Sequence, residues 1–254
     1  MAGLDLRIEG RRAAVAAGSA GLGLASARAL AAAGVRVALC GRDAERAEAA
    51  ANGIRADGGE AVGLAADVST TEGATAFVDE AIAALGGVDI LVANAGGPPP
   101  GTFASTDLDA YLPALRLNLL STVAMCTAAV PAMAERGWGR VVAITSMSVR
   151  QPIPDLILSN TARAGATGFL KTLALEVAPQ GVTVNSVQPG LHATDRLVQL
   201  HGGDPSGAAG AVPMGKLGDP ADFGAVVAFL CSEQARFITG AALPIDGGAT
   251  KGLQ

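Results

Sequence analysis

Short apolar runs rich in valine, isoleucine and leucine alternate along this chain with longer, alanine-rich amphipathic stretches. The apolar runs fall at residues 13–17, 35–40, 61–66, 88–94, 140–145, 182–188 and 241–245. Such runs are typical of parallel strands buried on both faces, and the stretches between them suit crossover helices. We therefore expect an α/β fold, with one doubly wound parallel sheet of about seven strands and helices on both faces.

The expected helices cover residues 22–33, 43–57, 70–85, 108–136, 156–178 and 221–232. The chain has 254 residues, of which 50% are hydrophobic, so it can bury one large core. No linker, internal repeat or block of charge interrupts the alternation. We expect a single domain over residues 1–254.

The charge of the chain argues against nucleic acid as a partner. The formal net charge is -5, and the 18 basic residues are dispersed, whereas binding to phosphates needs clustered lysine and arginine. Charged residues follow the N-terminus closely, and we expect neither a signal peptide nor a membrane span. The expectation is a cytoplasmic protein that acts on a small molecule.

The three cysteines, Cys40, Cys126 and Cys231, are far apart and lie in apolar surroundings. Buried reduced thiols fit this pattern better than a disulfide, a metal site or a nucleophile. We expect no metal site.

Glycines gather where the first expected strand meets the first helix, in the segment Gly18-Ser19-Ala20-Gly21-Leu22-Gly23. Glycines let the backbone approach a diphosphate closely, and the N–H groups at the start of a helix stabilise its charge. The position between strand and helix makes this a candidate dinucleotide site of the Rossmann type.

Residues 139–190 resemble the catalytic half of the short-chain dehydrogenase/reductase family. Ser146 lies at the family's catalytic serine, and Ala164-Gly165, Val184-Asn185 and Pro189-Gly190 follow without a gap. The resemblance extends from about Leu6 to Gly248. Where the family has Tyr-x-x-x-Lys, however, this chain has Ser159 and Arg163.

The resemblance implies a nicotinamide cofactor. The family's glycine motif, Thr-Gly-x-x-x-Gly-x-Gly, has Ala16 and Ala17 here in place of its threonine and first glycine, and Gly18 is expected to compensate one position later. Further family motifs appear in order after later strands. The implied cofactor-binding residues are Gly18, Ser19, Gly21, Leu22, Gly23, Arg42, Asp67, Val68, Asn94, Ala95, Gly96, Arg163, Pro189, Gly190 and Thr194.

The end of the second strand favours NADP(H) over NAD(H). Gly41 occupies the position where NAD-specific members of the family keep an acid, and Arg42 follows it. An arginine can bind a 2′-phosphate that a carboxylate would repel. The alternative is that Arg42 merely begins the next helix in solvent.

The resemblance assigns catalytic roles to Asn118, Ser146, Ser159 and Arg163. Ser146 would polarise the substrate oxygen, Asn118 would support a water relay, and Arg163 would bind ribose hydroxyls. Arginine keeps its proton in proteins, so Arg163 cannot conduct a proton as the family's lysine does. Ser159 is a weaker acid than tyrosine and reaches less far, so water or the substrate itself must supply the proton.

Other proton donors remain open. His192 follows Pro189-Gly190 and could protonate a product, or could simply line the loop. Asp155 precedes the Ser159 helix and could instead be its N-cap. Tyr111, the only tyrosine, is expected to pack in a helix, and His201 is expected to face solvent.

These features predict an NADP(H)-dependent oxidoreductase that acts on a small carbonyl, alcohol or imine. Two alternatives are a nucleotide-binding pseudoenzyme with a regulatory or scaffolding role, and redox-neutral chemistry in the same pocket. Three consecutive prolines, Pro98 to Pro100, stiffen the loop beside the expected nicotinamide site and indicate a divergent substrate. The resemblance also implies a homodimer or homotetramer and a substrate loop at about residues 191–215.

Overall fold

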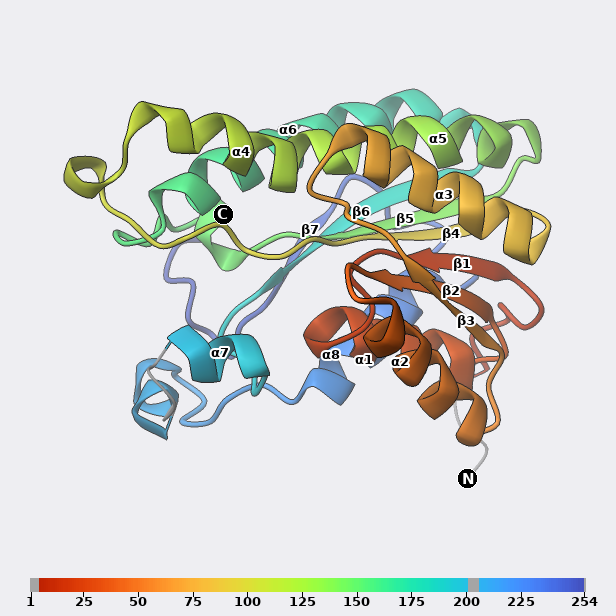
Figure 1. The fold of residues 1–254 in the computed structure, drawn as a ribbon, viewed down its shortest axis with the longest axis horizontal. Helices are drawn as coiled ribbons and strands as arrows, with labels where there is room; N and C mark the ends of the chain where they lie inside the picture. Colours follow the sequence, from red (N-terminus) through yellow and green to blue (C-terminus); the bar gives the residue numbers. More distant parts are fainter. Residues whose placement is uncertain (1–4, 201–205, 254) are drawn as a thin grey trace.

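Seven parallel strands form one sheet in a computed structural model that describes residues 5–200 and 206–253. The strand order is β3-β2-β1-β4-β5-β6-β7 (Figure 1). The strands are β1 (Arg12–Val15), β2 (Arg36–Gly41), β3 (Ala61–Ala65), β4 (Ile90–Ala93), β5 (Gly139–Ile144), β6 (Val182–Pro189) and β7 (Ala242–Ile245). The doubly wound sheet expected from the alternation of apolar runs is confirmed.

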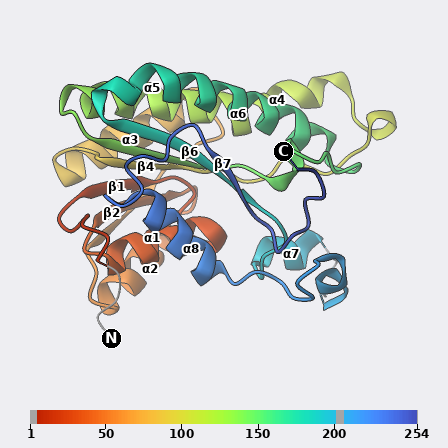
Figure 2. The same ribbon diagram turned by 180° about the vertical axis from the view of Figure 1, so that it is seen from behind.

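Helices cover both faces of this sheet (Figure 1). The α-helices of the described residues are α1 (Gly21–Ala32), α2 (Ala44–Ala56), α3 (Thr71–Leu85), α4 (Tyr111–Leu115), α5 (Ser121–Glu135), α6 (Ile157–Val177), α7 (Asp195–Leu200) and α8 (Pro220–Leu230). One buried cluster joins the sheet to α3, α5 and α6, and a second joins it to α1, α2 and α8. Viewed from behind, α8 lies alongside α1 (Figure 2). The inner strands β1, β2, β4, β5 and β6 are buried along almost their whole length, which explains their continuous apolar runs, whereas the edge strands β3 and β7 are only partly buried.

The strand order reverses direction between β1 and β4. From β1 the chain builds outward to β2 and β3, and it then returns to place β4 on the other side of β1. The loops after β1 and β4 consequently leave the sheet in opposite directions. A crevice is expected at the carboxyl ends of these two strands.

The segment predicted as one helix over residues 108–136 is helical throughout but not uniformly α-helical. A π-helical segment, Arg116–Leu120, lies between α4 and α5, and it contains the buried Asn118. By length and composition alone, Leu108–Glu135 could cross a membrane, since residues 117–134 carry no charge. In the fold, the apolar side chains of α5 instead join the buried cluster beneath α3 and α6.

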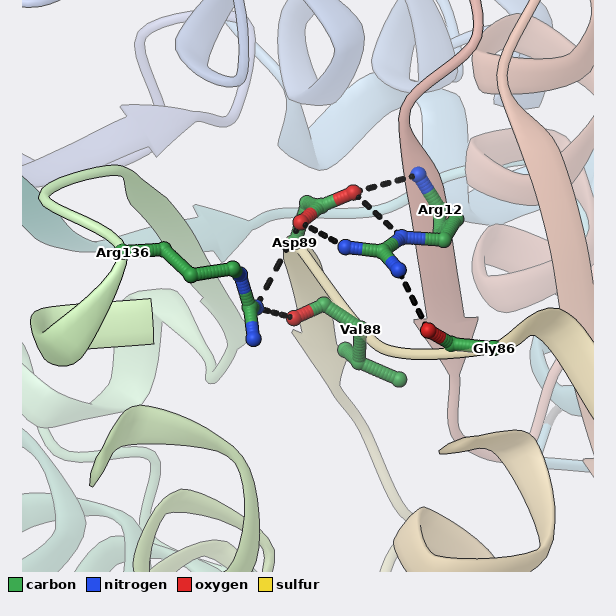
Figure 3. Close-up of polar contacts among 5 residues, drawn as sticks. All are labelled: Arg12, Gly86, Val88, Asp89 and Arg136. Atoms are coloured by element: carbon green, nitrogen blue, oxygen red, sulfur yellow. Dashed lines mark hydrogen bonds and ion pairs between the residues drawn. The ribbon is translucent and has the colours of Figure 1, made fainter. Parts of the chain in front are cut away.

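An ion-pair cluster joins the amino ends of β1 and β4 (Figure 3). Arg12 donates from Nη2 to Asp89 Oδ1 at 2.7 Å and from Nε to Oδ2 at 2.8 Å, and Arg136 Nη2 lies 3.4 Å from Oδ1. Burial pushes the pKa of Asp89 upward, but the bonds and charge of Arg12, with Arg136, hold it below its ordinary value. This cluster pins the two central strands at the end of the sheet opposite the crevice.

The predicted substrate loop is partly helical. Residues 195–200 form α7, which projects beyond the carboxyl ends of the strands (Figure 1), and residues 206–211 form a short 3-10 helix. His201 lies outside the described residues.

The prediction of buried, reduced cysteines is confirmed. Cys40, Cys126 and Cys231 are all buried free thiols, and burial raises the pKa of each to about 12. A thiol with so high a pKa carries almost no thiolate at neutral pH, so none of the three is an activated nucleophile.

Candidate active site

A cleft of about 560 Å³ opens at the carboxyl ends of β1, β4, β5 and β6. It lies at the reversal of strand order, where α/β sheets bind their ligands. It brings together most of the residues that the sequence predicted. The lining includes Gly21, Leu22, Gly23, Arg42, Asn94, Ala95, Gly96, Ser146, Ser159, Arg163, Pro189, Gly190, His192 and Thr194.

The glycine turn has the close backbone packing that a diphosphate site requires. Gly21 has a φ of +54°, and a Cβ at Gly23 would lie 2.3 Å from the Ala17 carbonyl oxygen. Asn94 Nδ2 lies 3.4 Å from that same oxygen, so the loop after β4 supports the turn. On the other side of the cleft, the Thr194 side chain lies against Gly21.

Ala17 itself adopts the left-handed conformation, with a φ of +45°. It stands where the family's first glycine stands, so the turn keeps its shape although the residue has a methyl group. Gly18, which was expected to compensate for the methyl group, does not itself have a positive φ. Gly18 is needed for space, because a Cβ there would lie 2.9 Å from the Leu39 Cβ.

Two arginines line the outer end of the cleft, after β2. Arg42 is joined there by Arg46 from the first turn of α2, which the sequence analysis missed although it lies one helical turn further on. Arg46 lies 3.9 Å from Asp195 across the cleft. An acidic residue in place of Gly41 would have to displace the Ser19 hydroxyl, because a Cβ there would lie 2.5 Å from Ser19 Oγ.

Five of the predicted site residues do not line the cleft: Gly18, Ser19, Asp67, Val68 and Asn118. Val68 is buried in the core beneath α3. The Asp67 carboxylate accepts a hydrogen bond from the Ser69 backbone N–H at 3.0 Å.

Ser146 lies at the carboxyl end of β5 and lines the cleft. Its Oγ accepts a hydrogen bond from the Ser148 backbone N–H at 3.1 Å. Because this bond uses a lone pair, the hydroxyl proton of Ser146 remains available for a ligand. The short 3-10 helix Met147–Val149, which supplies the bond, thereby fixes the direction of the serine.

Ser159 and Arg163 lie one turn apart on α6, and both line the cleft. Arg163 Nη1 donates to two backbone carbonyl oxygens at the end of β5, those of Ile144, the last residue of the strand, at 3.0 Å and of Thr145, the residue after it, at 2.9 Å. Burial, and secondarily the charge of Arg196, lowers the pKa of Arg163 to about 10. Arg163 therefore remains cationic at neutral pH and holds the strand end that precedes Ser146.

Asn118 reaches the site through the loop after β4. Its Nδ2 donates to the Gly96 carbonyl oxygen at 2.9 Å, and its buried Oδ1 has no partner among the described residues. The π-helical segment turns this side chain inward beneath α6, where a Cβ at Gly165 would lie 3.2 Å from Leu119. An unpaired buried acceptor of this kind suits a bound water.

The other candidate proton donors are poorly placed. His192 lines the cleft, but its ring packs edge-on against Phe223 at 5.2 Å and lies beneath Gly218. Burial lowers its pKa, against the opposing effects of the Gly190 carbonyl and Asp219, so the ring is neutral at neutral pH. Asp155 is exposed and does not cap α6, which has no side-chain cap, and neither Asp155 nor Tyr111 lines the cleft.

The inner part of the cleft holds a second residue that the sequence analysis missed, Arg196 of α7. Its Nη2 lies 3.3 Å from the Pro98 carbonyl oxygen and faces Gly97, both in the loop after β4. No motif marks this residue, and only the fold shows that α7 lies opposite that loop.

Comparison with known proteins agrees with this arrangement. A family model described as enoyl-(acyl carrier protein) reductase matches residues 16–250. Dehydrogenase/reductase SDR family member 4 of Sus scrofa is 32% identical over 249 residues, covering 97% of this chain and 89% of the relative.

Two solved structures also superpose over nearly the whole chain, each with a TM-score of 0.91. L-sorbose reductase from Gluconobacter frateurii, complexed with NADPH and L-sorbose, is 31% identical and covers 98% of this chain and 100% of its own. A 7α-hydroxysteroid dehydrogenase complexed with NADH and 7-oxo glycochenodeoxycholic acid is 29% identical, with 98% of each chain covered. With its sheet, its glycine turn and its Ser146 cleft, the chain belongs to the short-chain dehydrogenase/reductase family.

Proposed function

We propose that this protein is an NADP(H)-dependent oxidoreductase that acts on a small carbonyl, alcohol or imine substrate. The observation that carries the proposal is the convergence of the glycine turn, Ser146 and the segment from Pro189 to Thr194 on one cleft. A nicotinamide cofactor, when bound, supplies or accepts the hydride. The protein itself then has to bind the cofactor and the substrate, orient them relative to each other, and supply or remove one proton.

The cleft fits such a cofactor at both ends. The glycine turn offers open backbone, and Gly96 has no atom within 4 Å of the place where a Cβ would stand. Arg42 and Arg46 give the outer end the positive charge that a 2′-phosphate requires. Asp67 and Val68 follow β3 and stay proposed adenine contacts although they do not line the cleft. Ser19 lies beside Gly41, since its Oγ is 2.5 Å from the place where a Cβ of Gly41 would stand.

Ser146 is the residue proposed to polarise the substrate oxygen, because its proton is free and its direction is fixed. Arg163 adds positive charge behind it and is placed to reach ribose hydroxyls with Nη2 or Nε, which make no hydrogen bond among the described residues. Asn118 offers its unpaired Oδ1 to a relay water. Ser159, with that water or the substrate, handles the proton.

A nucleotide-binding protein without redox turnover is the second candidate. It is favoured by one observation: among the described residues that line the cleft there is no tyrosine and no lysine. The same observation leaves redox-neutral chemistry in the cleft as a variant of the proposal. We also propose assembly as a homodimer or homotetramer, and Leu112, Leu120 and Leu175 are exposed apolar side chains that an interface could cover.

The cofactor proposal predicts that NADPH binds more tightly than NADH, and that Arg42→Ala weakens NADPH by about tenfold with little effect on NADH. The physical reason is the loss of a charge-assisted bond to the 2′-phosphate. Fluorescence titration of both cofactors measures this, with Arg28→Ala as the control, because Arg28 lies on α1 outside the cleft lining. Equal affinity of the parent protein for NADH and NADPH would contradict the proposal.

A further inference from the structure

The inner end of the cleft carries more positive charge than a nicotinamide and a neutral substrate need. Arg163 and Arg196 both line it, and neither forms an ion pair with a carboxylate among the described residues. Asp195, the one acid among the described residues that line the cleft, lies 3.9 Å from Arg46 instead. Two unpaired guanidinium groups in one cleft repel each other, so an anion between them is stabilised.

The contacts of the two arginines show which one is free to bind a ligand. Arg163 is committed to the carbonyl oxygens of Ile144 and Thr145. Arg196 is exposed, and its one hydrogen bond among the described residues, to the neutral Pro98 carbonyl oxygen, is 3.3 Å long. A carboxylate would accept shorter, charge-assisted bonds from the same guanidinium, often in pairs.

The geometry of the neighbouring side chains limits the rest of the ligand. Met147, Ile153, Leu156 and Leu191 line the cleft beside Ser146 and Ser159. Such a surface suits an apolar body rather than a sugar. The loop that faces Arg196 is stiffened by Pro98 to Pro100, and the Pro98 carbonyl oxygen lies 3.3 Å from the Arg196 Nη2 atom.

We propose that the substrate is a small organic acid with an apolar body, whose carboxylate is bound by Arg196 while Ser146 contacts its reacting oxygen. This inference rests on the proposed function for the reaction, but it concerns binding and can be tested without turnover. The other source of an anion at this place is the diphosphate of the cofactor. The substrate carboxylate and the cofactor diphosphate would both bind the guanidinium through anionic oxygens, so the experiment must distinguish these two anions.

The test compares acids with neutral partners of the same shape on the protein saturated with NADP+. Calorimetric titration with phenylacetate and phenylacetamide, and with phenylglyoxylate and its methyl ester, measures the preference for the carboxylate. The parent protein is expected to bind each acid at least about tenfold more tightly than its neutral partner. Arg196→Gln should abolish this preference, Arg196→Lys should retain part of it, and the affinity for NADPH should change by no more than about twofold.

Arg236→Gln is the matched control, because it removes one positive charge at an exposed arginine that does not line the cleft. It should leave the acid preference unchanged. The inference would be overturned if the parent protein bound neither acid, or if it bound each acid and its neutral partner with equal affinity. A large loss of NADPH affinity in Arg196→Gln with the acid preference intact would also overturn it, because that result assigns the arginine to the diphosphate. An acid preference that depends on Arg196 without any oxidation of NADPH would instead uphold this inference and remove the proposed function.

Discussion

Ser146→Ala is expected to lower kcat by about 10²–10³-fold, because it removes a donor aimed at the oxygen on which charge develops. The Ser146 Oγ already accepts the Ser148 N–H, so its hydroxyl proton is available to donate to a ligand. Ser159→Ala should keep most of the activity, since a water can occupy the space above it. Steady-state oxidation of NADPH, with cofactor affinity measured separately by fluorescence, gives both values.

Ser148→Ala is the matched control for this prediction. It removes a buried hydroxyl without a hydrogen-bond partner among the described residues, but it keeps the backbone N–H that orients Ser146. Its kcat should stay within about threefold of the parent, since no group that it removes touches the cleft. A larger loss in Ser159→Ala than in Ser146→Ala would reverse the roles of the two serines.

The second large effect is a gain of activity. The double change Ser159→Tyr with Arg163→Lys should raise the reduction of activated ketones by about 10²-fold, because general-acid assistance typically contributes 10²–10⁴-fold. The single change Ser159→Tyr should raise this ketone reduction by a smaller factor than the double change. Arg163 would keep its proton and its two bonds to the end of β5, so it could not serve the new phenol as a proton path.

The assay is NADPH oxidation against a panel of activated ketones, with thermal unfolding to confirm that each variant is folded. Arg163→Lys alone is the control, since it changes the cation without adding a phenol. If the double variant binds NADPH but its ketone reduction does not increase, the cleft catalyses another kind of reaction or no reaction. Brisk turnover by the parent protein that His192→Ala abolishes would instead make His192 the acid, against its packing beneath Gly218.

The order of the elements could be predicted from the sequence because burial on both faces leaves a direct pattern in the strands. The local conformation of the backbone could not be predicted from the sequence. The π-helical segment around Asn118 interrupts the helix without any glycine or proline in Arg116–Leu120. Ala17 adopts a positive φ although alanine does not favour it, since the surrounding turn dictates the conformation.

The candidate site was predicted where its residues belong to motifs next to one strand end, as Ser146 and Asn94 do. The residues that were missed lie on helices, and only the folded structure shows that these helices reach the cleft. Arg46 lies four residues after Arg42, in the first turn of the helix that was expected to begin at residue 43, so it could have been found from its place in the sequence. Arg196 could not have been found from the sequence, because its partner across the cleft, Pro98, is 98 residues away in the chain.

Hydride transfer in this cleft is tested most directly with NADPH that carries deuterium at the nicotinamide C4, labelled on one face and then on the other. The protein is incubated with each cofactor and with carbonyl and imine compounds, including phenylglyoxylate, and the products are analysed by mass spectrometry. We expect one deuterium at the former carbonyl or imine carbon, from one face only, and far less of it with Ser146→Ala. Tight binding of NADPH with no deuterium in any product would contradict the oxidoreductase proposal and leave a nucleotide-binding protein without redox turnover.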